Sequence, residues 1–239
     1  MTERFALPPS LAEIRNYVDG AFVATSQTFD NVSPLTGRVL ARVHEADAAL
    51  VDRAVAAARR ALDEGPWGRS TVEQRAAALH RVADMIERRF DDFLAAEIAD
   101  TGRPLAQARQ LDVYRGIANF RTFADLGKTA HGDFFETHLA DGSQLINYST
   151  RKPLGVVASI SPWNLPILSL TWKAAPALIC GNAIVCKPSE ETPSSATLIA
   201  EAFDEAGVPP GVFNVVHGFG PGSAGQALTR HPGIDAVTF

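Results

Sequence analysis

Cysteine is scarce in this sequence of 239 residues, which contains only Cys180 and Cys186. Two cysteines are too few for the disulfide framework of a small secreted protein. Residues 1–10 also lack the charged stretch followed by an apolar stretch that marks a secretory signal. We therefore expect a protein of the reducing cytoplasm. Both cysteines are expected to be inert thiols of the core, one at a helix end and one in a buried strand.

A strong charge of one sign is also lacking, since 22 Lys and Arg residues face 27 Asp and Glu residues. Without a long basic run, we expect no nucleic-acid partner. The longest apolar stretch is interrupted by Trp172, Lys173 and Pro176, so we expect no membrane span. The six histidines show no metal-ligand spacing, and no metal site is predicted. Hydrophobic residues make up 46% of the chain, enough for a sizeable core.

Three turns organise the extended parts of the chain. Residues 16–45 show short extended segments, with a hairpin signal at Asp19-Gly20 and a second turn at Ser33–Gly37. Residues 131–153 form a two-stranded excursion with Asp141-Gly142 at its turn. Such an arm is typical of an oligomer contact, and a surface flap fits the pattern equally well.

Four helices are predicted between these extended segments. A capping box at Ser70–Glu73 opens the second helix, and Asp91 is expected to cap the third, which ends near Gly102. The fourth helix is expected over residues 105–128. The first helix has an apolar face at helical spacing, made of Val51, Val55, Ala58 and Leu62.

From residue 154 onward, strands and helices alternate with short turns. Apolar runs predict strands at 156–160, 183–186, 212–216 and 235–239, with helices between them. Thr192-Pro193 is expected to supply the N-cap and first residue of one helix. The alternation predicts an α/β fold with a doubly wound parallel sheet, whose ligands bind at the carboxyl ends of the strands. We expect the loop after the last strand to be missing, which leaves an aggregation-prone sheet edge.

Two polar motifs, Ile160–Pro166 and Lys187–Glu190, each follow a predicted strand. These two motifs and five further segments follow one another along the chain in an order and spacing that resemble those of the aldehyde dehydrogenase superfamily. The segments are Asn31–Gly37, Asp100–Pro104, Arg151–Val156, Gly207–Pro209 and Asn214–Gly220. The closest resemblance is to the 2-hydroxymuconic and 2-aminomuconic semialdehyde dehydrogenases.

The resemblance implies NAD-dependent oxidation of an aldehyde to a carboxylic acid. In that family a cysteine thiolate attacks the aldehyde, hydride moves to NAD, and a glutamate-activated water hydrolyses the thioester. Residues 1–130 would be the N-terminal helical part of the NAD-binding domain, 131–153 the oligomerisation arm, and 154–239 the Rossmann-like core. The segments with the catalytic cysteine and glutamate are expected to be missing, so we expect this half to be inactive alone. The full-length enzyme is expected to be a homo-oligomer.

The resemblance assigns catalytic roles to Asn164 and Lys173. An amide N–H of Asn164 would stabilise the oxyanion formed by thiolate attack, a contribution of ~3 kcal/mol for one such donor. The alternative is that Asn164 caps the following helix. Lys173 matches a lysine with a supporting role in some relatives, and an ordinary helix-surface lysine is an equal alternative.

Cofactor binding is expected at the strand ends. In the family, Lys187 and Glu190 bind the adenosine ribose hydroxyls, and a carboxylate there favours NAD over NADP; solvated charges at a strand end are the alternative. Gly220–Gly225 matches G-x-G-x-x-G. We do not expect this turn to bind the pyrophosphate, because the pyrophosphate motif belongs to the first strand–helix unit and this turn lies in the third. In the family the matching turn lies against the adenine. The predicted cofactor-binding residues are Ile160, Ser161, Pro162, Trp163, Lys187, Ser189, Glu190, Gly220 and Gly225.

Arg115 is the principal candidate for substrate binding, because a guanidinium binds a carboxylate through two hydrogen bonds and a muconic semialdehyde carries one. Arg121 is its rival, and a solvated helix arginine is the alternative. Leu165, Ser169 and Trp172 share one helical face, which lines the substrate tunnel in the family or forms a buried stripe. Trp163 would lie near the nicotinamide or in the core.

Three other interpretations remain open. Asp100, with the backbone near Asn31-Val32, matches a monovalent-cation site of some relatives. An acyl-phosphate reductase would use the same cysteine chemistry with NADPH, which Glu190 disfavours. A non-catalytic remnant or NAD-binding module is the alternative of a different class.

Overall fold

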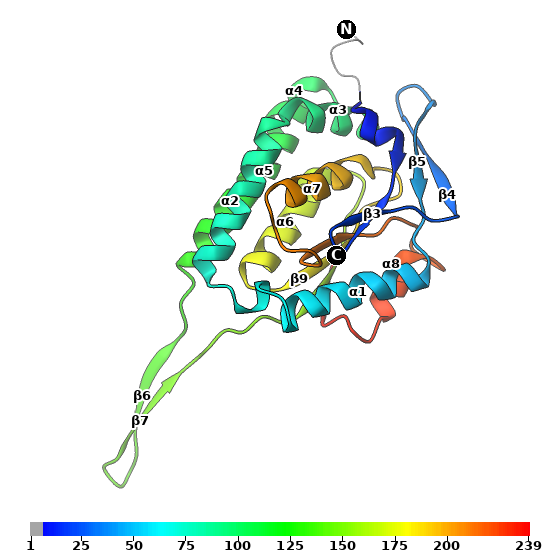
Figure 1. Ribbon diagram of the computed structural model, residues 1–239. Coiled ribbons are helices and arrows are strands. Elements are labelled where there is room, and N and C mark those ends of the chain that lie inside the picture. The colour runs from blue at the N-terminus through cyan, green and yellow to red at the C-terminus, as the bar shows by residue number, and fades with distance from the viewer. Residues whose placement is uncertain (1–6) are drawn as a thin grey trace.

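The computed structural model describes residues 7–239 and has a sheet of six strands between two layers of helices (Figure 1). The strands run in the order β11-β8-β9-β10-β2-β3. The first four are mutually parallel, whereas β2 and β3 are antiparallel to their neighbours. The strands are β11 (Ala236–Thr238), β8 (Val156–Ile160), β9 (Ala183–Lys187), β10 (Phe213–Val215), β2 (Asn16–Val18) and β3 (Ala21–Val23). The predicted doubly wound parallel sheet is therefore confirmed.

Successive side chains along the buried strands point to opposite faces of the sheet, so the hydrophobic core has two clusters, one on each face. Val157 and Ile184 face the larger cluster, while Val156 and Val185 face the smaller one. Because successive strand residues point to opposite faces, a sheet that is covered on both sides needs continuous apolar strands. The larger cluster includes α2 (Val72–Arg88), α3 (Phe90–Thr101), α5 (Tyr114–Lys128), α6 (Pro166–Ile179) and α7 (Ser194–Glu205), and the smaller one includes α1 (Ala48–Asp63) and α8 (Ala224–Arg230).

The Asp19-Gly20 hairpin forms as predicted, with both residues at positive φ. Its attachment to the main sheet, through the pairing of Tyr17 with Val215, has no local signal in the sequence. A second sheet combines β1 (Glu13–Ile14), β5 (Val39–His44) and β4 (Thr28–Val32). The predicted turn at Ser33–Gly37 joins β4 to β5. Two short 3₁₀ helices are also present: η1 (Pro9–Ala12) precedes β1, and η2 (Trp67–Arg69) lies between α1 and α2.

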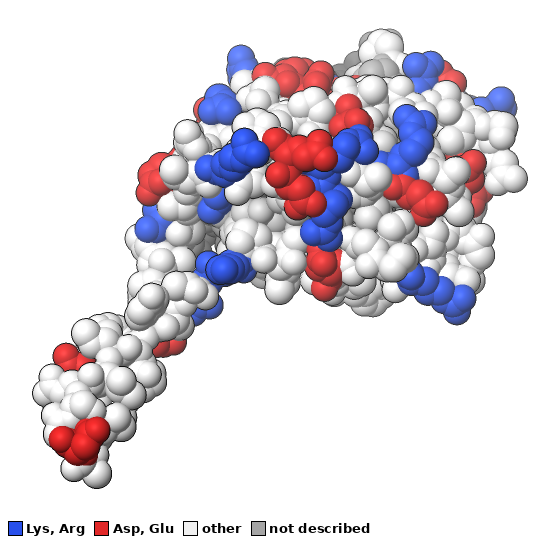
Figure 2. All heavy atoms as spheres, turned by 60° about the horizontal axis from the view of Figure 1, so that its bottom comes forward, with Lys and Arg blue, Asp and Glu red and all other residues white. Residues whose placement is uncertain are grey.

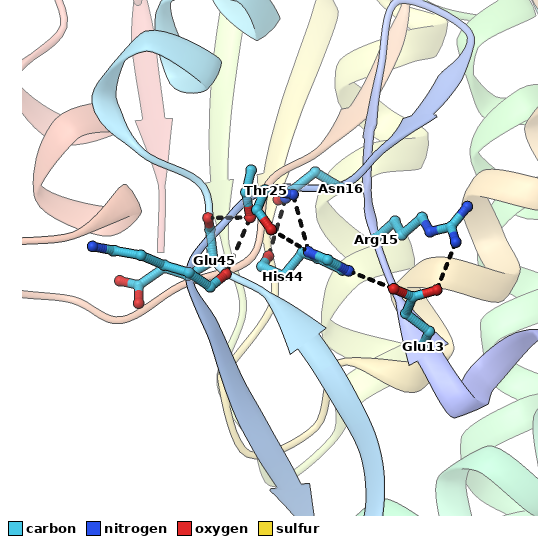
Figure 3. Close-up of polar contacts among 7 residues, drawn as sticks. Glu13, Arg15, Asn16, Thr25, His44 and Glu45 are labelled. Atoms are coloured by element: carbon cyan, nitrogen blue, oxygen red, sulfur yellow. Dashed lines mark hydrogen bonds and ion pairs between the residues drawn. The ribbon is translucent and has the colours of Figure 1, made fainter.

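A buried histidine ties these extended segments together (Figure 3). The ring of His44 contacts the Glu13 carboxylate through Nε2 at 2.9 Å, and Nδ1 accepts the Thr25 amide hydrogen at 2.9 Å. Asn16 donates to the His44 carbonyl at 3.0 Å. The contacts with His44 and Arg15 lower the pKa of the Glu13 carboxyl. This network joins the second sheet to β2 of the main sheet.

The predicted arm is confirmed as a hairpin of β6 (Phe134–His138) and β7 (Gln144–Tyr148), with Asp141 and Gly142 at its turn. It projects from the body, and charged side chains gather mainly on the body (Figure 2). The exposed apolar side chains of the hairpin are Phe134, Phe135, Leu145, Ile146 and Tyr148.

Two predicted helix caps are wrong by a residue or more. The capping box of α2 uses Thr71 and Gln74, one residue later than predicted. Asp91 does not cap α3, because the helix begins at Phe90 and its N-cap is Arg89, without a side-chain hydrogen bond. Asp91 lies instead in the first turn, where its charge still favours the helix dipole.

The expected cap of α7 is also wrong, for a tertiary reason. Pro193 occupies the N-cap position, and the hydroxyl of Thr192 has no hydrogen-bond partner among the described residues. The first amide, that of Ser194, donates instead to the Asp100 carboxylate at 2.9 Å. The Asp100 carboxylate, which belongs to α3, therefore accepts the amide hydrogen that the side chain of a local N-cap would otherwise have accepted.

The predicted helix over residues 105–128 is interrupted. It consists of α4 (Leu105–Gln107), a π-helical segment η3 (Ala108–Val113) and α5. The prediction of a buried thiol is confirmed for Cys186, which is fully buried, and burial raises the pKa of its thiol to about 12. Cys180, in contrast, is exposed at the end of α6. The prediction of an inert core thiol is therefore wrong for Cys180.

Candidate functional site

The predicted site residues meet at the carboxyl edge of the parallel strands. Ile160, the last residue of β8, pairs with Lys187, the last residue of β9. The loop after β8 therefore lies beside the loop after β9, and the Ser161 amide donates to the Lys187 carbonyl at 3.0 Å. The register of the sheet thus brings the Ile160–Pro166 and Lys187–Glu190 motifs together, as ligand binding at strand ends requires.

Asn164 is exposed on the loop between β8 and α6. The N-cap of α6 is Leu165, and within residues 7–239 neither Leu165 nor Asn164 makes a capping hydrogen bond through its side chain. The structure therefore does not support the alternative in which Asn164 acts as the cap. The backbone carbonyl of Asn164 accepts a hydrogen bond from the Arg103 guanidinium, which leaves its side-chain amide free for another contact.

A buried carboxylate holds the start of α6. Glu97 of α3 accepts the Ile167 amide hydrogen at 3.1 Å and a second hydrogen bond from the Ser195 hydroxyl. Burial raises the pKa of this fully buried carboxyl to about 8, although both hydrogen bonds act in the opposite direction. Glu97 thus links α3, α6 and α7 directly beneath the Asn164 loop.

Lys187 is buried and its ammonium is held by the backbone. It donates to the carbonyls of Pro188 and Gly218, at 2.8 and 2.7 Å, and lies 3.3 Å from a carboxylate oxygen of the partly exposed Glu190. Burial lowers the pKa of Lys187, while Glu190 opposes that shift. The pair presents one fixed cation and one accessible carboxylate at the strand ends.

The ammonium of Lys173 points back to the sheet, where it donates to the Ile160 carbonyl at 2.8 Å. The side chain is half-buried, and burial lowers its pKa. The structure therefore places Lys173 against the end of β8, the strand that leads into the Asn164 loop. Of the other residues predicted to bind the cofactor, Ser161 and Ser189 are buried, whereas Pro162 and Trp163 are exposed.

The two glycines of the glycine-rich turn have different surroundings. A Cβ on Gly225 would lie 3.1 Å from the Gly220 Cα, so Gly225 allows α8 to pack against its own turn. A Cβ on Gly220 would meet nothing within 4 Å, which leaves open space beside the turn. Ser223 fixes the turn by accepting the Phe219 amide hydrogen at 2.9 Å and donating to Glu45 at 2.5 Å.

The residues predicted to bind substrate lie on α5 and α6. The Arg115 guanidinium lies over the Trp172 ring, 5.8 Å from its centroid. Its rival Arg121 contacts both Asp84 and Glu87, at 2.9 and 2.6 Å, so two carboxylates already neutralise it.

The exposure of the face shared by Leu165, Ser169 and Trp172 argues against a buried stripe. Trp172 is 51% exposed, and Leu165 and Ser169 are partly exposed. Trp163 is 64% exposed, so it is not a core residue of the described chain. This face is therefore accessible at the surface of the described chain.

A pocket of about 330 Å³ lies between the Asn164 loop and the second sheet, lined by Val32, Asp100, Trp163 and Thr192 among others. Burial raises the pKa of Asp100 to about 6, against the effect of hydrogen bonds from Asn31 and Ser194. Within residues 7–239, no group of three His, Cys, Asp or Glu residues is arranged to hold a metal ion. In the same part of the chain, no helix is long and apolar enough to cross a membrane.

Sequence reasoning missed four buried polar residues around the site. Glu97 and Asp112 are fully buried, and Arg103 is mostly buried beside Asp112. His217 is buried near Lys187, and neither of its ring nitrogens has a hydrogen-bond partner within residues 7–239. Burial and the nearby Lys187 lower the pKa of His217 to about 3. No local signal distinguishes these residues from solvated ones, because their burial depends on neighbours far away in the sequence.

The fold and this arrangement define the class of doubly wound α/β proteins, with polar motifs gathered at the carboxyl ends of the parallel strands. The model of the aldehyde dehydrogenase family matches residues 22–239, and the chain belongs to that family. It is 58% identical to a 2-aminomuconic 6-semialdehyde dehydrogenase of Pseudomonas sp., over 96% of this chain and 46% of that protein. It is 56% identical to a 2-hydroxymuconic semialdehyde dehydrogenase of Pseudomonas sp. (strain CF600), over 96% of this chain and 47% of that protein. The chain spans about half the length of these relatives.

Solved structures show the same relationship. An aldehyde dehydrogenase of Bacillus cereus in complex with NAD+ superposes with a TM-score of 0.91 at 37% identity, over 98% of this chain and 48% of that one. An indole-3-acetaldehyde dehydrogenase in complex with NAD+ gives a TM-score of 0.88 at 36% identity, over 95% and 45% of the two chains. The fold described here is therefore that of half of an aldehyde dehydrogenase.

Proposed function

We propose that this chain is the NAD-binding half of an enzyme that oxidises a carboxylated semialdehyde, such as 2-hydroxymuconic semialdehyde, to the acid. The observation that carries the proposal is the register of β8 against β9, which joins Asn164, Lys187 and Glu190 at one edge of the sheet. The similarity to two semialdehyde dehydrogenases supports the substrate class.

NAD would lie across the strand ends, with its adenosine ribose hydroxyls on Lys187 and Glu190. The residues present fit this group: Lys187 fixes Glu190 from below, Glu190 is accessible, and open space lies beside Gly220. A carboxylate repels a 2′-phosphate, so Glu190 favours NAD over NADP. The predicted contacts of Ile160, Ser161, Pro162, Trp163, Ser189 and Gly225 belong to the same proposal. When bound, NAD supplies the acceptor for the hydride.

Asn164 would donate its side-chain amide to the oxyanion that forms when a thiolate attacks the aldehyde. A donor that is already oriented costs no reorganisation during the reaction, and removal of one typically lowers kcat by about 10²–10³. Lys173 would support this step by holding the end of β8 through the Ile160 carbonyl. The cysteine and glutamate would come from a part of the enzyme outside these residues, so the 239-residue chain alone would not oxidise aldehydes.

Arg115 would hold the carboxylate at the far end of the substrate. Its guanidinium is oriented by the Trp172 ring and is free of a carboxylate partner among the described residues. Leu165, Ser169 and Trp172 would line the passage to Asn164. The exposed apolar side chains of the β6–β7 arm favour assembly of the full-length enzyme into a homo-oligomer. The enzyme would act in the cytoplasm.

The test is calorimetry of NAD and NADP binding to the 239-residue chain and to its Glu190→Gln variant. We expect NAD to bind and NADP to bind at least tenfold more weakly, with a smaller difference in the variant, because the variant removes the charge that repels the phosphate. A chain shown by circular dichroism to be folded that binds neither nucleotide would overturn the proposed cofactor site. Equal affinity for both nucleotides would overturn the role of Glu190.

A further inference from the structure

We propose that Arg103 and Asp112 form a positioning pair that orients the Asn164 loop. The proposal rests on the role proposed above for Asn164 and adds the residues that aim its side chain. Neither residue contacts the site of the reaction through its own side chain, so both act through Asn164.

Arg103 is placed by the end of α3. Gly102 closes that helix at φ 71°, a conformation that glycine adopts without strain, and thereby turns the chain toward the Asn164 loop. The Arg103 amide then donates to the Thr101 hydroxyl at 3.3 Å. A Cβ on Gly102 would approach the Leu35 side chain at 3.2 Å, so this turn is also packed.

The guanidinium of Arg103 bridges two groups. Nη2 donates to the backbone carbonyl of Asn164, and Nη1 lies 3.5 Å from Oδ1 of Asp112. The Arg103 side chain is 20% exposed, and that of Asp112 is 0% exposed. The forked, planar guanidinium is suited to holding two acceptors at once, which a single ammonium does less well.

Asp112 is an unusual partner for a structural ion pair. Its Oδ2 atom is buried and has no hydrogen-bond partner among the described residues, and burial raises the pKa of its carboxyl. Arg103 is the cation that opposes this shift. A buried carboxylate with one partner contributes little to stability but becomes costly when that partner is removed. The pair therefore has a geometry that stability alone does not account for.

The backbone around Asp112 is irregular in a way that serves this contact. Asp112 lies in the π-helical segment η3, which inserts into the helix over residues 105–128. Its neighbour Leu111 is 44% exposed while Asp112 is buried. Single π-helical turns are rare and are found frequently at functional sites. Here the irregularity places a carboxylate, rather than an apolar side chain, beneath Arg103.

Within residues 7–239, Arg103 donates the one hydrogen bond found at Asn164, because α6 begins with the bond from the Ser169 amide to the Leu165 carbonyl. Holding the carbonyl fixes the peptide plane that follows Asn164, and this plane limits the direction of its Cα–Cβ bond. The Arg103–Asp112 pair therefore sets the direction of the Cα–Cβ bond from which the side-chain amide extends.

The first experiment measures the contact in the 239-residue chain by NMR. In Arg103→Met, we expect the carbonyl carbon of Asn164 and the amide of Leu165 to shift, because the hydrogen bond to that carbonyl is lost. Arg109→Met is the matched control, since Arg109 is an exposed neighbour whose carboxylate contact, to Asp91, is 3.7 Å long. Equal shifts at Asn164 in both variants, or none in either, would overturn the proposal.

The second experiment measures kcat and KM in the full-length dehydrogenase that carries this chain. We expect Arg103→Met to lower kcat about tenfold, as a misplacement of a catalytic group does, with little change in the KM for NAD. Arg103→Lys should recover part of the loss, because it keeps a cation beside Asp112. In an Asn164→Ala background, Arg103→Met should cause no further loss, whereas an additive loss would show that Arg103 does not act through Asn164.

The two failures are distinguishable. If Asn164→Ala leaves kcat unchanged, the proposed role of Asn164 fails, and the positioning role fails with it. If Asn164→Ala lowers kcat but Arg103→Met does not, only the positioning role fails.

Discussion

The guanidinium of Arg115 lies over the indole ring of Trp172, 5.8 Å from its centroid. The two residues come from neighbouring helices, α5 and α6, which pack closely because Gly116 leaves room for the Ile167 side chain. A cation–π contact orients the guanidinium without using its hydrogen-bond donors. Arg115 therefore remains able to bind a carboxylate.

This arrangement predicts the effect of Arg115→Met in the full-length enzyme. We expect the KM for a carboxylated semialdehyde to rise about 10- to 100-fold, the value of a lost charge-assisted hydrogen bond of roughly 1.5–3 kcal/mol. The KM for an aldehyde without a carboxylate should change little. Steady-state kinetics with both substrates check this, and Arg121→Met, which removes an arginine already paired with Asp84 and Glu87, is the control. A similar rise for both substrates would contradict a role in carboxylate binding.

The buried Glu97 predicts a specific dependence of stability on pH. Its folded-state pKa of about 8 exceeds the ordinary value of 4.5, so the folded state binds its proton more tightly than the unfolded state does. The contribution to stability is fully present below the unfolded pKa and is lost as the pH rises through the folded pKa. The free energy of unfolding should therefore fall by up to roughly 1.4 kcal/mol per pH unit between about pH 6 and pH 8.

Urea unfolding of the chain at several pH values measures this slope. Glu97→Gln keeps an acceptor for the Ile167 amide and the Ser195 hydroxyl but does not titrate. Its free energy of unfolding should change much less over the same range. Parallel pH profiles of the two proteins would show that Glu97 is not responsible.

Asp100, which caps α7 from another helix, can be compared directly with Thr192, the residue that the sequence predicted as its local cap. Asp100→Ala removes the acceptor of the Ser194 amide and hydroxyl, and should lower the free energy of unfolding by about 1–3 kcal/mol. Thr192→Val removes a hydroxyl that has no partner in the described residues and should change it by less than about 0.5 kcal/mol. Chemical denaturation of the two variants checks the order, and a greater loss in Thr192→Val would contradict the observed cap.

The arm predicts the self-association of the protein. Ile146 is 65% exposed on β7 and pairs across the hairpin with Glu136. We expect Ile146→Glu to weaken oligomer formation at least tenfold, because a charge then lies in the apolar surface that a second copy would cover. Sedimentation velocity over a range of concentrations measures this, with Glu136→Gln as the control. An unchanged association in Ile146→Glu would place the contact elsewhere.

Local patterns predicted the elements around the site well. Continuous apolar runs indicated β8, β9 and β10, because a strand covered on both faces has no polar side. The Asp19-Gly20 and Asp141-Gly142 pairs indicated their turns, because these residues accept the backbone angles that tight hairpins need. The exposure of Cys180 was predicted incorrectly. The sequence pattern places this residue at the end of α6, but whether a helix end is buried depends on what the rest of the fold packs against it.

The sequence by itself determined the alternation of strands and helices, the turns between them, and the two motifs that end β8 and β9. Each of these depends on backbone preferences and side-chain periodicity within a few residues. Only the tertiary structure decided that Asp100 caps α7, that Tyr17 pairs with Val215, and that Arg103 joins Asp112 to Asn164. These contacts join residues that are apart in the sequence, and whether a charged side chain is solvated or buried depends on what the rest of the fold places beside it.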